Sequence, residues 1–410
     1  MRGPPGADPG TGRAPPAGGP PVSYAQDRRC FDADSHLMPE ADFLARHADP
    51  KYREALWIGG GANGGEAFAG NFAGILEKVQ ARLRDPQQTA ALEENVIASA
   101  KGWFAHGAVD PRERSRTLDL LGFQGQLVFS TFCTPFLAAA KPELRYAGTR
   151  AHNRAMAAFC ADDPRLMGVA LVPLDEPTRA LQELDAALAL GCRAVHVPSD
   201  APGGNTRGFA PSHLDLEPFW ARLAEAQVPV VLHIGGGKLL PKAYHQNGHP
   251  RPKDWLGGGE NLRGKDFPAT HHSPENFLTS LVLDGVFERH PELRCGVIEL
   301  GASWVPGLQR NLDHAFDAFR RHEPLLQALS LKPSEYLRRQ VRFTPFPFED
   351  VGWLVAQAGP ELFLFSSDYP HPEGGRNPIG RFEASFNAAG TSETERERFY
   401  ARNFAAWMQL

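Results

Sequence analysis

Acidic and imidazole side chains alternate in one short segment near the start of the sequence. The segment CFDADSHLMPE carries Asp32, Asp34 and His36 at every second position. Residues two apart in a strand face the same side of a sheet, so Asp34 and His36 are expected to point together toward one cation. Imidazole and carboxylate ligands together suit Zn, Fe and Mn better than Mg or Ca. Asp32 shares this parity, which leaves two roles open: orienting His36 beside a metal, or accepting backbone hydrogen bonds at the edge of the core.

Further polar residues stand where other apolar runs end. Near the ends of four runs stand His196 in CRAVHVPS, His233 in VPVVLHIGG, Glu299 in LRCGVIELG and Asp368 in LFLFSSDYP. A lone acid or histidine at a strand end is more often a cap or a hydrogen-bonded loop residue than a ligand, although for His196 the two interpretations are about equal. His371 could either shape its loop or act as an acid or base. Their recurrence at several strand ends favours a shared site. The predicted metal ligands are Asp34, His36, His196, His233, Glu299 and Asp368, with Asp32 and His371 as catalytic or neighbouring residues.

Eight apolar runs of strand length alternate with helical patterns and must position these residues. Runs that are apolar almost to their ends are typical of parallel strands buried on both faces. Eight such units predict an α/β fold, a (β/α)8 TIM barrel whose active site lies at the carboxyl ends of the strands. An open doubly wound sheet would need a glycine-rich phosphate turn after the first strand, and DADSHLMPE offers none. The expected strands are 30–36, 124–131, 166–174, 192–199, 228–236, 293–301, 341–346 and 362–370.

The predicted domain organisation is a tail followed by one catalytic domain. Residues 1–26 are rich in Gly, Pro and Ala, and we expect them to be disordered. Residues 27–410 form the predicted barrel, with insertions at about 37–122, after the first strand, and about 235–275, after the fifth. Both insertions follow the carboxyl end of a strand, so we expect them to cover the mouth of the site.

Composition excludes several classes of protein. The 410 residues are 42% hydrophobic and carry a net charge of −5, with a pI near 6.3. No basic tract is present, so we expect no nucleic-acid partner. The five cysteines contain no CxxC pair, which favours a reducing cytoplasm over a disulfide framework. No run is apolar and long enough to span a membrane.

Four segments together resemble the amidohydrolase-related family of metal-dependent TIM barrels. They are DADSH, VVLHIGG, HPELRCGVIELGASWVPGLQRNLD and SSDYPHPEG. The resemblance implies metal ligands at Asp34, His36, His233 and Asp368, and a cytosolic enzyme that forms homo-oligomers and acts on a small molecule. The sequence also departs from the family pattern. Many members carry His-x-His on the first strand, decarboxylating members usually have histidine where Glu299 stands, and the lysine that is carboxylated on the fourth strand of binuclear hydrolases is missing from the strand of His196.

Six candidate ligands exceed the three that a catalytic zinc ion needs, which favours two iron ions, with Zn or Mn as alternatives. This set resembles the branch of the family that contains the TIM-barrel diiron monooxygenase of platensimycin and platencin biosynthesis. That resemblance implies hydroxylation of a diterpenoid acid carried as a coenzyme A thioester, with electrons from an external donor. The cations of the second insertion could then meet the coenzyme's phosphates, although a solvated loop surface is the likelier interpretation of any one of them; they are Lys238, Lys242, Arg251, Lys253, Arg263 and Lys265. The alternatives are a metal-dependent hydrolase or decarboxylase of a small carboxylated or acyl substrate, and a barrel whose metal is structural.

Overall fold

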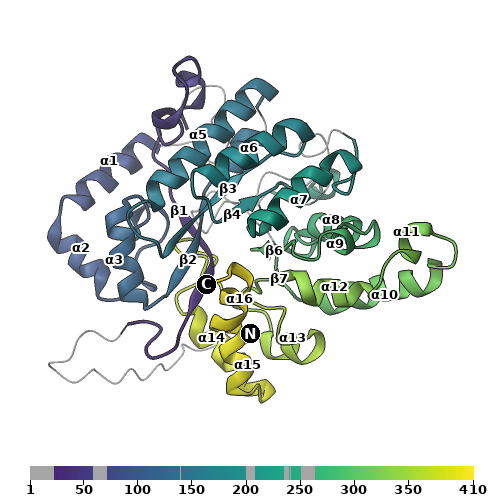
Figure 1. Ribbon diagram of the computed structural model, residues 1–410. Helices are drawn as coiled ribbons and strands as arrows, with labels where there is room; N and C mark the ends of the chain where they lie inside the picture. Colours follow the sequence, from purple (N-terminus) through teal and green to yellow (C-terminus); the bar gives the residue numbers. More distant parts are fainter. Residues whose placement is uncertain are drawn as a thin grey trace.

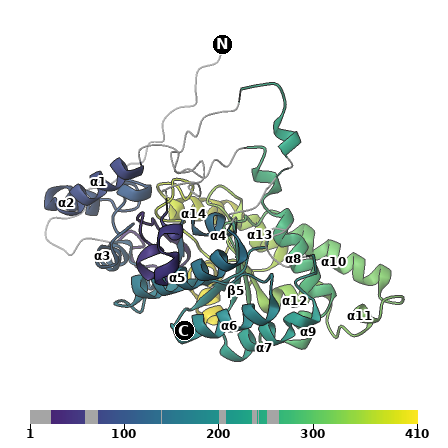
Figure 2. The same ribbon diagram turned by 90° about the horizontal axis from the view of Figure 1, so that it is seen from above.

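Seven parallel strands form one sheet in the order of the sequence, and helices surround it (Figures 1 and 2). The computed structural model describes residues 23–58, 72–138, 140–199, 208–234, 240, 242–250 and 264–410. Each strand pairs in parallel with the next, which confirms the predicted α/β class and gives a barrel-like, curled sheet. The strands are β1 (Phe31–Leu37), β2 (Gly125–Ser130), β3 (Leu166–Leu171), β4 (Ala194–His196), β5 (Val230–His233), β6 (Cys295–Ile298) and β7 (Val341–Phe343).

The eighth predicted strand is not a regular strand in the part of the chain that the structure describes. Residues 362–369 instead make one isolated parallel bridge to β7 and one to β1, between Phe343 and Phe363 and between Ser35 and Tyr369. The nitrogen of Ala33 also donates to the oxygen of Phe365 at 3.0 Å. Segment 362–369 therefore joins the first and last strands without forming a continuous ladder.

An irregularity in β1 decides which way its acidic residues point. The register between β1 and β2 shifts between Asp32 and Ser35, as at a β-bulge. Phe31 and Ala33 belong to the buried cluster inside the sheet, whereas Asp34 joins His36 at the carboxyl end of the strand. The expectation that Asp32 shares the direction of Asp34 and His36 is therefore wrong, because the bulge breaks the alternation.

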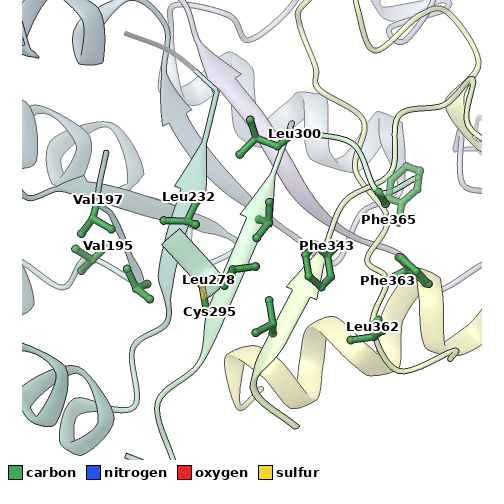
Figure 3. Close-up of a cluster of buried hydrophobic side chains, with 14 of the residues drawn as sticks. Val195, Val197, Leu232, Leu278, Cys295, Leu300, Phe343, Leu362, Phe363 and Phe365 are labelled. Carbon is green, nitrogen blue, oxygen red and sulfur yellow. The ribbon is translucent and has the colours of Figure 1, made fainter. Parts of the chain in front are cut away.

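Apolar side chains fill both sides of the sheet. Inside, residues such as Leu127, Val231 and Ile298 pack against Phe404 and Trp407 of the C-terminal helix, which covers the amino ends of the strands. Outside, a larger cluster lies between the sheet and the helices, and Figure 3 shows its part around β4 to β7. Because both faces are buried, the runs read as almost wholly apolar in the sequence.

The helices begin at recognisable signals. Asp110 accepts a hydrogen bond from the nitrogen of Glu113 at the start of α3, with Pro111 in the first turn. Apolar residues three and four apart in the sequence predict helices at 178–190, 216–226, 304–321, 334–340 and 349–358, and these match α6, α7, α10, α12 and α13, whose ranges follow. The helices are α1 (Phe72–Leu83), α2 (Pro86–Glu93), α3 (Pro111–Leu121), α4 (Cys133–Ala138), α5 (Pro142–Cys160), α6 (Pro177–Ala189), α7 (Glu217–Ala226), α8 (His272–Leu283), α9 (Val286–Arg289), α10 (Val305–Phe319), α11 (Pro324–Gln327), α12 (Pro333–Gln340), α13 (Val351–Ala358), α14 (Pro378–Ala389), α15 (Glu393–Glu397) and α16 (Asn403–Met408).

A polar wedge from α5 fills the place where β2 and β3 separate. Paired residues of these strands end at Val128 and Gly168. Beyond that point, the Asn153 amide donates to the oxygen of Leu171 at 3.1 Å and accepts from its nitrogen at 2.8 Å. His152 spans the remaining gap, with Nδ1 at 2.8 Å from Asn153 Oδ1 and Nε2 at 2.7 Å from Ser130 Oγ. The backbone groups freed by the separation are thereby satisfied.

Parts of the predicted tail and insertions fall outside the described residues. Residues 1–22 are among them, whereas the nitrogens of Tyr24 and Ala25 donate to α3 at 2.9 and 2.8 Å. In the second insertion, Lys265 Nζ donates to the oxygen of Tyr244 at 3.0 Å. The expected phosphate-binding cations Lys238, Arg251, Lys253 and Arg263 lie outside the described residues. No helix in the described ranges is long and apolar enough to cross a membrane.

Candidate metal centre

Carboxylates and imidazoles from four parts of the chain meet at the carboxyl ends of the strands. Asp34 and His36 come from β1, and His233 is the last residue of β5. Glu299 follows β6, and Asp368 lies in segment 362–369. All five side chains are at most 8% exposed. A buried space with three carboxylates strongly favours a bound cation, because unpaired buried charge is very costly.

The donor atoms lie at distances that suit a common ion. His36 Nε2 is 3.2 Å from Asp34 Oδ1, 3.5 Å from Asp368 Oδ1 and 3.6 Å from Glu299 Oε2. His233 Nε2 is 3.3 Å from Asp34 Oδ1 and 3.2 Å from Glu299 Oε2. Ligands bound at about 2.0–2.2 Å to one ion lie roughly 3–3.5 Å apart, which the separations in this cluster already match. The residues present therefore fit a divalent metal.

The ring of His233 is oriented as a metal ligand. Its Nδ1 is 2.7 Å from the carbonyl oxygen of Ile234, which can only accept, so Nδ1 carries the hydrogen. In the neutral ring Nε2 then presents a lone pair toward the oxygens of Asp34 and Glu299. A lone pair and two carboxylate oxygens repel one another unless a cation, either a metal ion or a proton on Nε2, lies between them.

Burial and mutual contact set the charges of the cluster. Burial alone would raise the pKa of Asp34, but the contacts with His233 and His36 outweigh it and lower that pKa. Burial, together with the charge of His371, lowers the pKa of His36 well below its usual value. Neutral imidazole is the form that binds metals, so the environment keeps His36 ready to act as a ligand.

Asp32 links β1 to segment 362–369 through hydrogen bonds, and we call the contact between these two segments the seam of the sheet. Asp32 is fully buried and accepts hydrogen bonds from the nitrogen and Oγ of Ser367, at 2.8 and 2.6 Å. It also accepts from Gln126 Nε2 at 2.7 Å and from the nitrogen of Asp34 at 3.2 Å. Burial raises the pKa of Asp32 to about 7, although the bonds from Ser367 and Gln126 oppose the rise. Of its two predicted roles, the contacts favour the acceptor of backbone and side-chain hydrogen bonds.

Two of the carboxylates stand on unusual backbone. Glu299 and Asp368 have φ angles of +55° and +50°, in the left-handed region that few non-glycine residues adopt. Thr344 Oγ1 accepts from the nitrogen of Glu299 at 2.9 Å, and the nitrogen of Asp368 donates to the oxygen of Asp34 at 2.9 Å. Such conformations gather at functional sites, where the surrounding structure maintains them.

His371 lies beside the cluster and overlaps it in a second group of donor atoms. Its Nδ1 is 2.9 Å from Asp368 Oδ1, and its ring stacks on that of His36 with centroids 3.9 Å apart. Its Nε2 is 3.0 Å from Thr131 Oγ1. Donor atoms of His36, Glu299, Asp368 and His371 lie within 4.8 Å of one another, as do those of Asp34, His36, His233 and Glu299.

His196, a predicted ligand, belongs to neither group of donor atoms. Its ring centroid is 5.8 Å from that of His233, and its Nε2 has no hydrogen-bond partner among the described residues. Phe129 lies beside both histidines, with its ring 4.3 Å from that of His233 and 6.4 Å from that of His196. The structure thus brings five of the six predicted ligands together and leaves His196 at the side.

Three neighbours of the cluster had no assigned role from the sequence. Thr131 and Thr344 bind His371 and Glu299, and single threonines at strand ends carry no distinguishing signal. The signal that would place Phe129 beside the cluster is the alternation of β2, which puts Leu127 and Phe129 on its inner face.

A barrel-like parallel sheet with buried carboxylates and imidazoles at its carboxyl rim defines a metal-dependent enzyme scaffold. The profile of the amidohydrolase family (Amidohydro_2) matches residues 31–407, and the chain belongs to that family. No curated protein matches the sequence.

Solved structures with the same fold include an amidohydrolase from Mycobacterium avium subsp. paratuberculosis K-10, 24% identical, with a TM-score of 0.69, over 94% of this chain and 100% of that one. The 5-carboxyvanillate decarboxylase of Sphingomonas paucimobilis is 17% identical, with a TM-score of 0.60, over 94% and 100%. A dihydroxybenzoic acid decarboxylase of Polaromonas sp. JS666, solved with manganese and 2-nitroresorcinol, is 18% identical, with a TM-score of 0.59, over 93% and 97%.

Proposed function

We propose that this chain is a divalent-metal-dependent enzyme that decarboxylates or hydrolyses a small carboxylated or acyl substrate, with manganese or zinc as its metal. Membership of the amidohydrolase family supports the class of enzyme. The decarboxylases of the same fold support the substrate class and manganese. This favours the hydrolase or decarboxylase alternative of the sequence over the diiron monooxygenase.

The observation that carries the proposal is the lone pair of His233 Nε2 facing the oxygens of Asp34 and Glu299 at 3.3 and 3.2 Å. In the neutral ring the proton is on Nδ1, so Nε2 can bind a metal that the carboxylates of Asp34 and Glu299 also contact. The proposed ligands are therefore Asp34, His36, His233, Glu299 and Asp368.

A metal in this pocket would act as a Lewis acid toward a carboxyl or carbonyl oxygen and would lower the pKa of bound water. The protein's own residues position the ligands and supply the proton. Asp32 and Ser367 fix the seam that carries Asp34 and Asp368. Thr131 Oγ1 donates to the oxygen of Leu37 at 2.9 Å and therefore accepts from His371 Nε2, while a proton on Nδ1 would be shared with Asp368 Oδ1. His371 is thus the proposed proton donor to the reacting carbon or leaving group.

The test is to load the purified chain with Mn²⁺ or Zn²⁺ and follow carbon dioxide release from a panel of hydroxybenzoates, and acid release from simple esters. Turnover that chelation abolishes and that Asp368→Asn lowers by about 10³-fold or more would support the proposal, since loss of a transition-state charge interaction costs several kcal/mol. Turnover unaffected by chelation would refute it.

A second candidate, a diiron monooxygenase, is favoured by one observation. The two groups of donor atoms overlap at His36 and Glu299, and His371 brings a third imidazole, so the cluster offers three carboxylates and three imidazoles. Such a mixed set suits iron in two oxidation states. In this version a coenzyme A thioester and an external electron donor would be the partners.

Metal stoichiometry and oxygen uptake separate the two candidates. Two irons per chain, with oxygen consumption in the presence of a reductant, would favour the monooxygenase. One manganese or zinc per chain without oxygen consumption would favour the first proposal.

A further inference from the structure

A short helical turn from the segment between β1 and β2 lies against the loop that carries Asp368 and His371. This turn, Gly102–Phe104, is anchored by the nitrogen of Gly102, which donates to the oxygen of Pro370 at 2.9 Å. Trp103 Nε1 donates to the oxygen of Pro39 at 3.0 Å, and its ring stacks on Phe132 with centroids 5.6 Å apart. Lys101, the residue before the turn, is therefore held in a fixed place beside the metal centre.

Two basic side chains face the ring of Tyr369, and only one of them is committed to a partner. Arg114 is fully buried, lies 5.5 Å from the ring centroid and donates through Nη2 to the carbonyl oxygen of His36. Lys101 Nζ lies 5.3 Å from the same centroid. Its ammonium nitrogen is buried and has no hydrogen-bond partner among the described residues. Arg114 is hydrogen-bonded to the backbone of β1, whereas the ammonium of Lys101 contacts the ring of Tyr369 but donates to no described residue.

A buried ammonium without an acceptor is costly, and the ring of Tyr369 compensates only part of the cost. Burial lowers the pKa of Lys101 to about 8, while the charges of Asp368 and Glu373 oppose the fall and that of Arg376 adds to it. The ammonium of Lys101 thus has two carboxylates near it but no hydrogen-bond acceptor among the described residues, and it lies close to a pocket proposed to receive a carboxylated substrate. An incoming anion would supply the missing acceptor.

We propose that Lys101 is the anion-binding residue of the active site, and that its ammonium receives a carboxylate group of the substrate beside Asp368. This inference rests on the proposed function for the class of substrate. It gives the segment between β1 and β2 a direct role in substrate binding. The ammonium would bind the charged group, while a metal held by the proposed ligands would polarise the reacting end.

Competitive labelling of lysines tests the proposal on the full-length, Mn²⁺-loaded chain without a known substrate. Trace acetic anhydride at pH 8, followed by peptide mass spectrometry, measures the reactivity of each amine with and without formate, benzoate, 2,6-dihydroxybenzoate or inorganic phosphate. Lys51 is the matched control, because its Nζ also faces a tyrosine ring, 4.6 Å from the centroid of Tyr52, but the residue is exposed.

We expect at least one carboxylate to reduce the labelling of Lys101 about 10-fold while leaving that of Lys51 unchanged, as binding near saturation requires. Lys101→Met should weaken binding of the same carboxylate by about 10- to 100-fold, and Lys101→Arg by much less, because a charge-assisted hydrogen bond is lost in the first and kept in the second. No protection by any carboxylate, or protection by phosphate alone, would overturn the proposal.

Two further measurements distinguish a ligand-binding role of Lys101 from a role in folding and from failure of the proposed function. If Lys101 serves the fold instead, Lys101→Met will lower the unfolding midpoint, whereas a ligand-binding role predicts an unchanged or higher midpoint because a buried unpaired charge is removed. Metal content and carbon dioxide release are measured on the same preparations. If the wild-type chain neither binds metal nor releases carbon dioxide, the proposed function is refuted. If it binds metal but no carboxylate protects Lys101 from labelling, only the role of Lys101 is refuted.

Discussion

Replacing Asp32 with asparagine should loosen the seam of the sheet and, through it, the metal centre. The side-chain amide of the Asp32→Asn variant keeps one oxygen for the backbone nitrogens of Asp34 and Ser367. Its NH₂ group, however, turns toward Ser367 Oγ and Gln126 Nε2, which in the wild type donate to Asp32 at 2.6 and 2.7 Å. Two hydrogen bonds to a charged acceptor are thereby lost, at about 1.5–3 kcal/mol each. Rotation of the Ser367 hydroxyl and a flip of the Gln126 amide would recover neutral bonds worth about 1 kcal/mol each.

The lost bonds total about 3–6 kcal/mol and the recovered bonds about 2 kcal/mol, so the expected net loss in the free energy of unfolding is about 1–4 kcal/mol. Because burial raises the pKa of Asp32 to about 7, removal of its buried charge brings the loss toward the lower end of this range. Because Asp34 and Asp368 flank the seam, affinity for Mn²⁺ should fall about 10- to 100-fold, as is usual when residues that orient ligands are changed. Urea unfolding at pH 8 and calorimetric titration with Mn²⁺ measure the two effects. Asp27→Asn is the control, since it removes an exposed carboxylate that lies shortly before β1 and makes no part of the contact between β1 and segment 362–369. A variant within about 0.5 kcal/mol of the wild type, the size of ordinary surface substitutions, with unchanged Mn²⁺ affinity would refute the reasoning.

Three further predictions follow from the same contacts. His233→Ala should abolish binding of Mn²⁺ while the metal-free chain stays folded, which calorimetric titration and circular dichroism would check; retained binding would exclude His233 as a ligand. Burial lowers the pKa of His152 to about 4, so the unfolded state binds more protons between about pH 6.5 and 4. Stability should therefore fall by about 3 kcal/mol as the pH falls through that window, and His152→Gln should flatten the fall in urea titrations; an equally steep fall in the variant would contradict this. Phe129→Ala should cost about 3–5 kcal/mol of stability and weaken Mn²⁺ binding, because the ring packs against His36 and His233; loss of stability without weaker binding would show that the ring serves only the core.

The sequence was sufficient to predict the parallel sheet and the meeting of distant residues. Each strand is apolar almost to its end, so the polar residue at the end stands out, as His233 does in VPVVLHIGG. Parallel topology then brings the carboxyl ends of the strands to one rim. The cluster of Asp34, His36, His233, Glu299 and Asp368 could therefore be anticipated without coordinates.

Other features depend on geometry that sequence patterns do not encode. The bulge in β1 reverses the direction of Asp32, and no local signal marks it. His196 has the same sequence character as His233, yet its ring lies to the side of the cluster. Segment 362–369 has the composition of a strand, but it makes only isolated bridges to β7 and β1, and Asp368 near its end has a positive φ. These differences arise from register and backbone conformation, which non-local contacts determine.

Metal analysis of the wild-type chain and of an Asp34→Asn/His233→Ala variant, both purified without added metal, probes the centre most directly. Mass spectrometry of the dissolved samples should find about one divalent ion per wild-type chain and essentially none in the variant, with both chains folded by circular dichroism. Equal metal content in the two proteins, or none in a folded wild type even after incubation with Mn²⁺, Zn²⁺ and Fe²⁺, would mean that these carboxylates and imidazoles do not bind a metal.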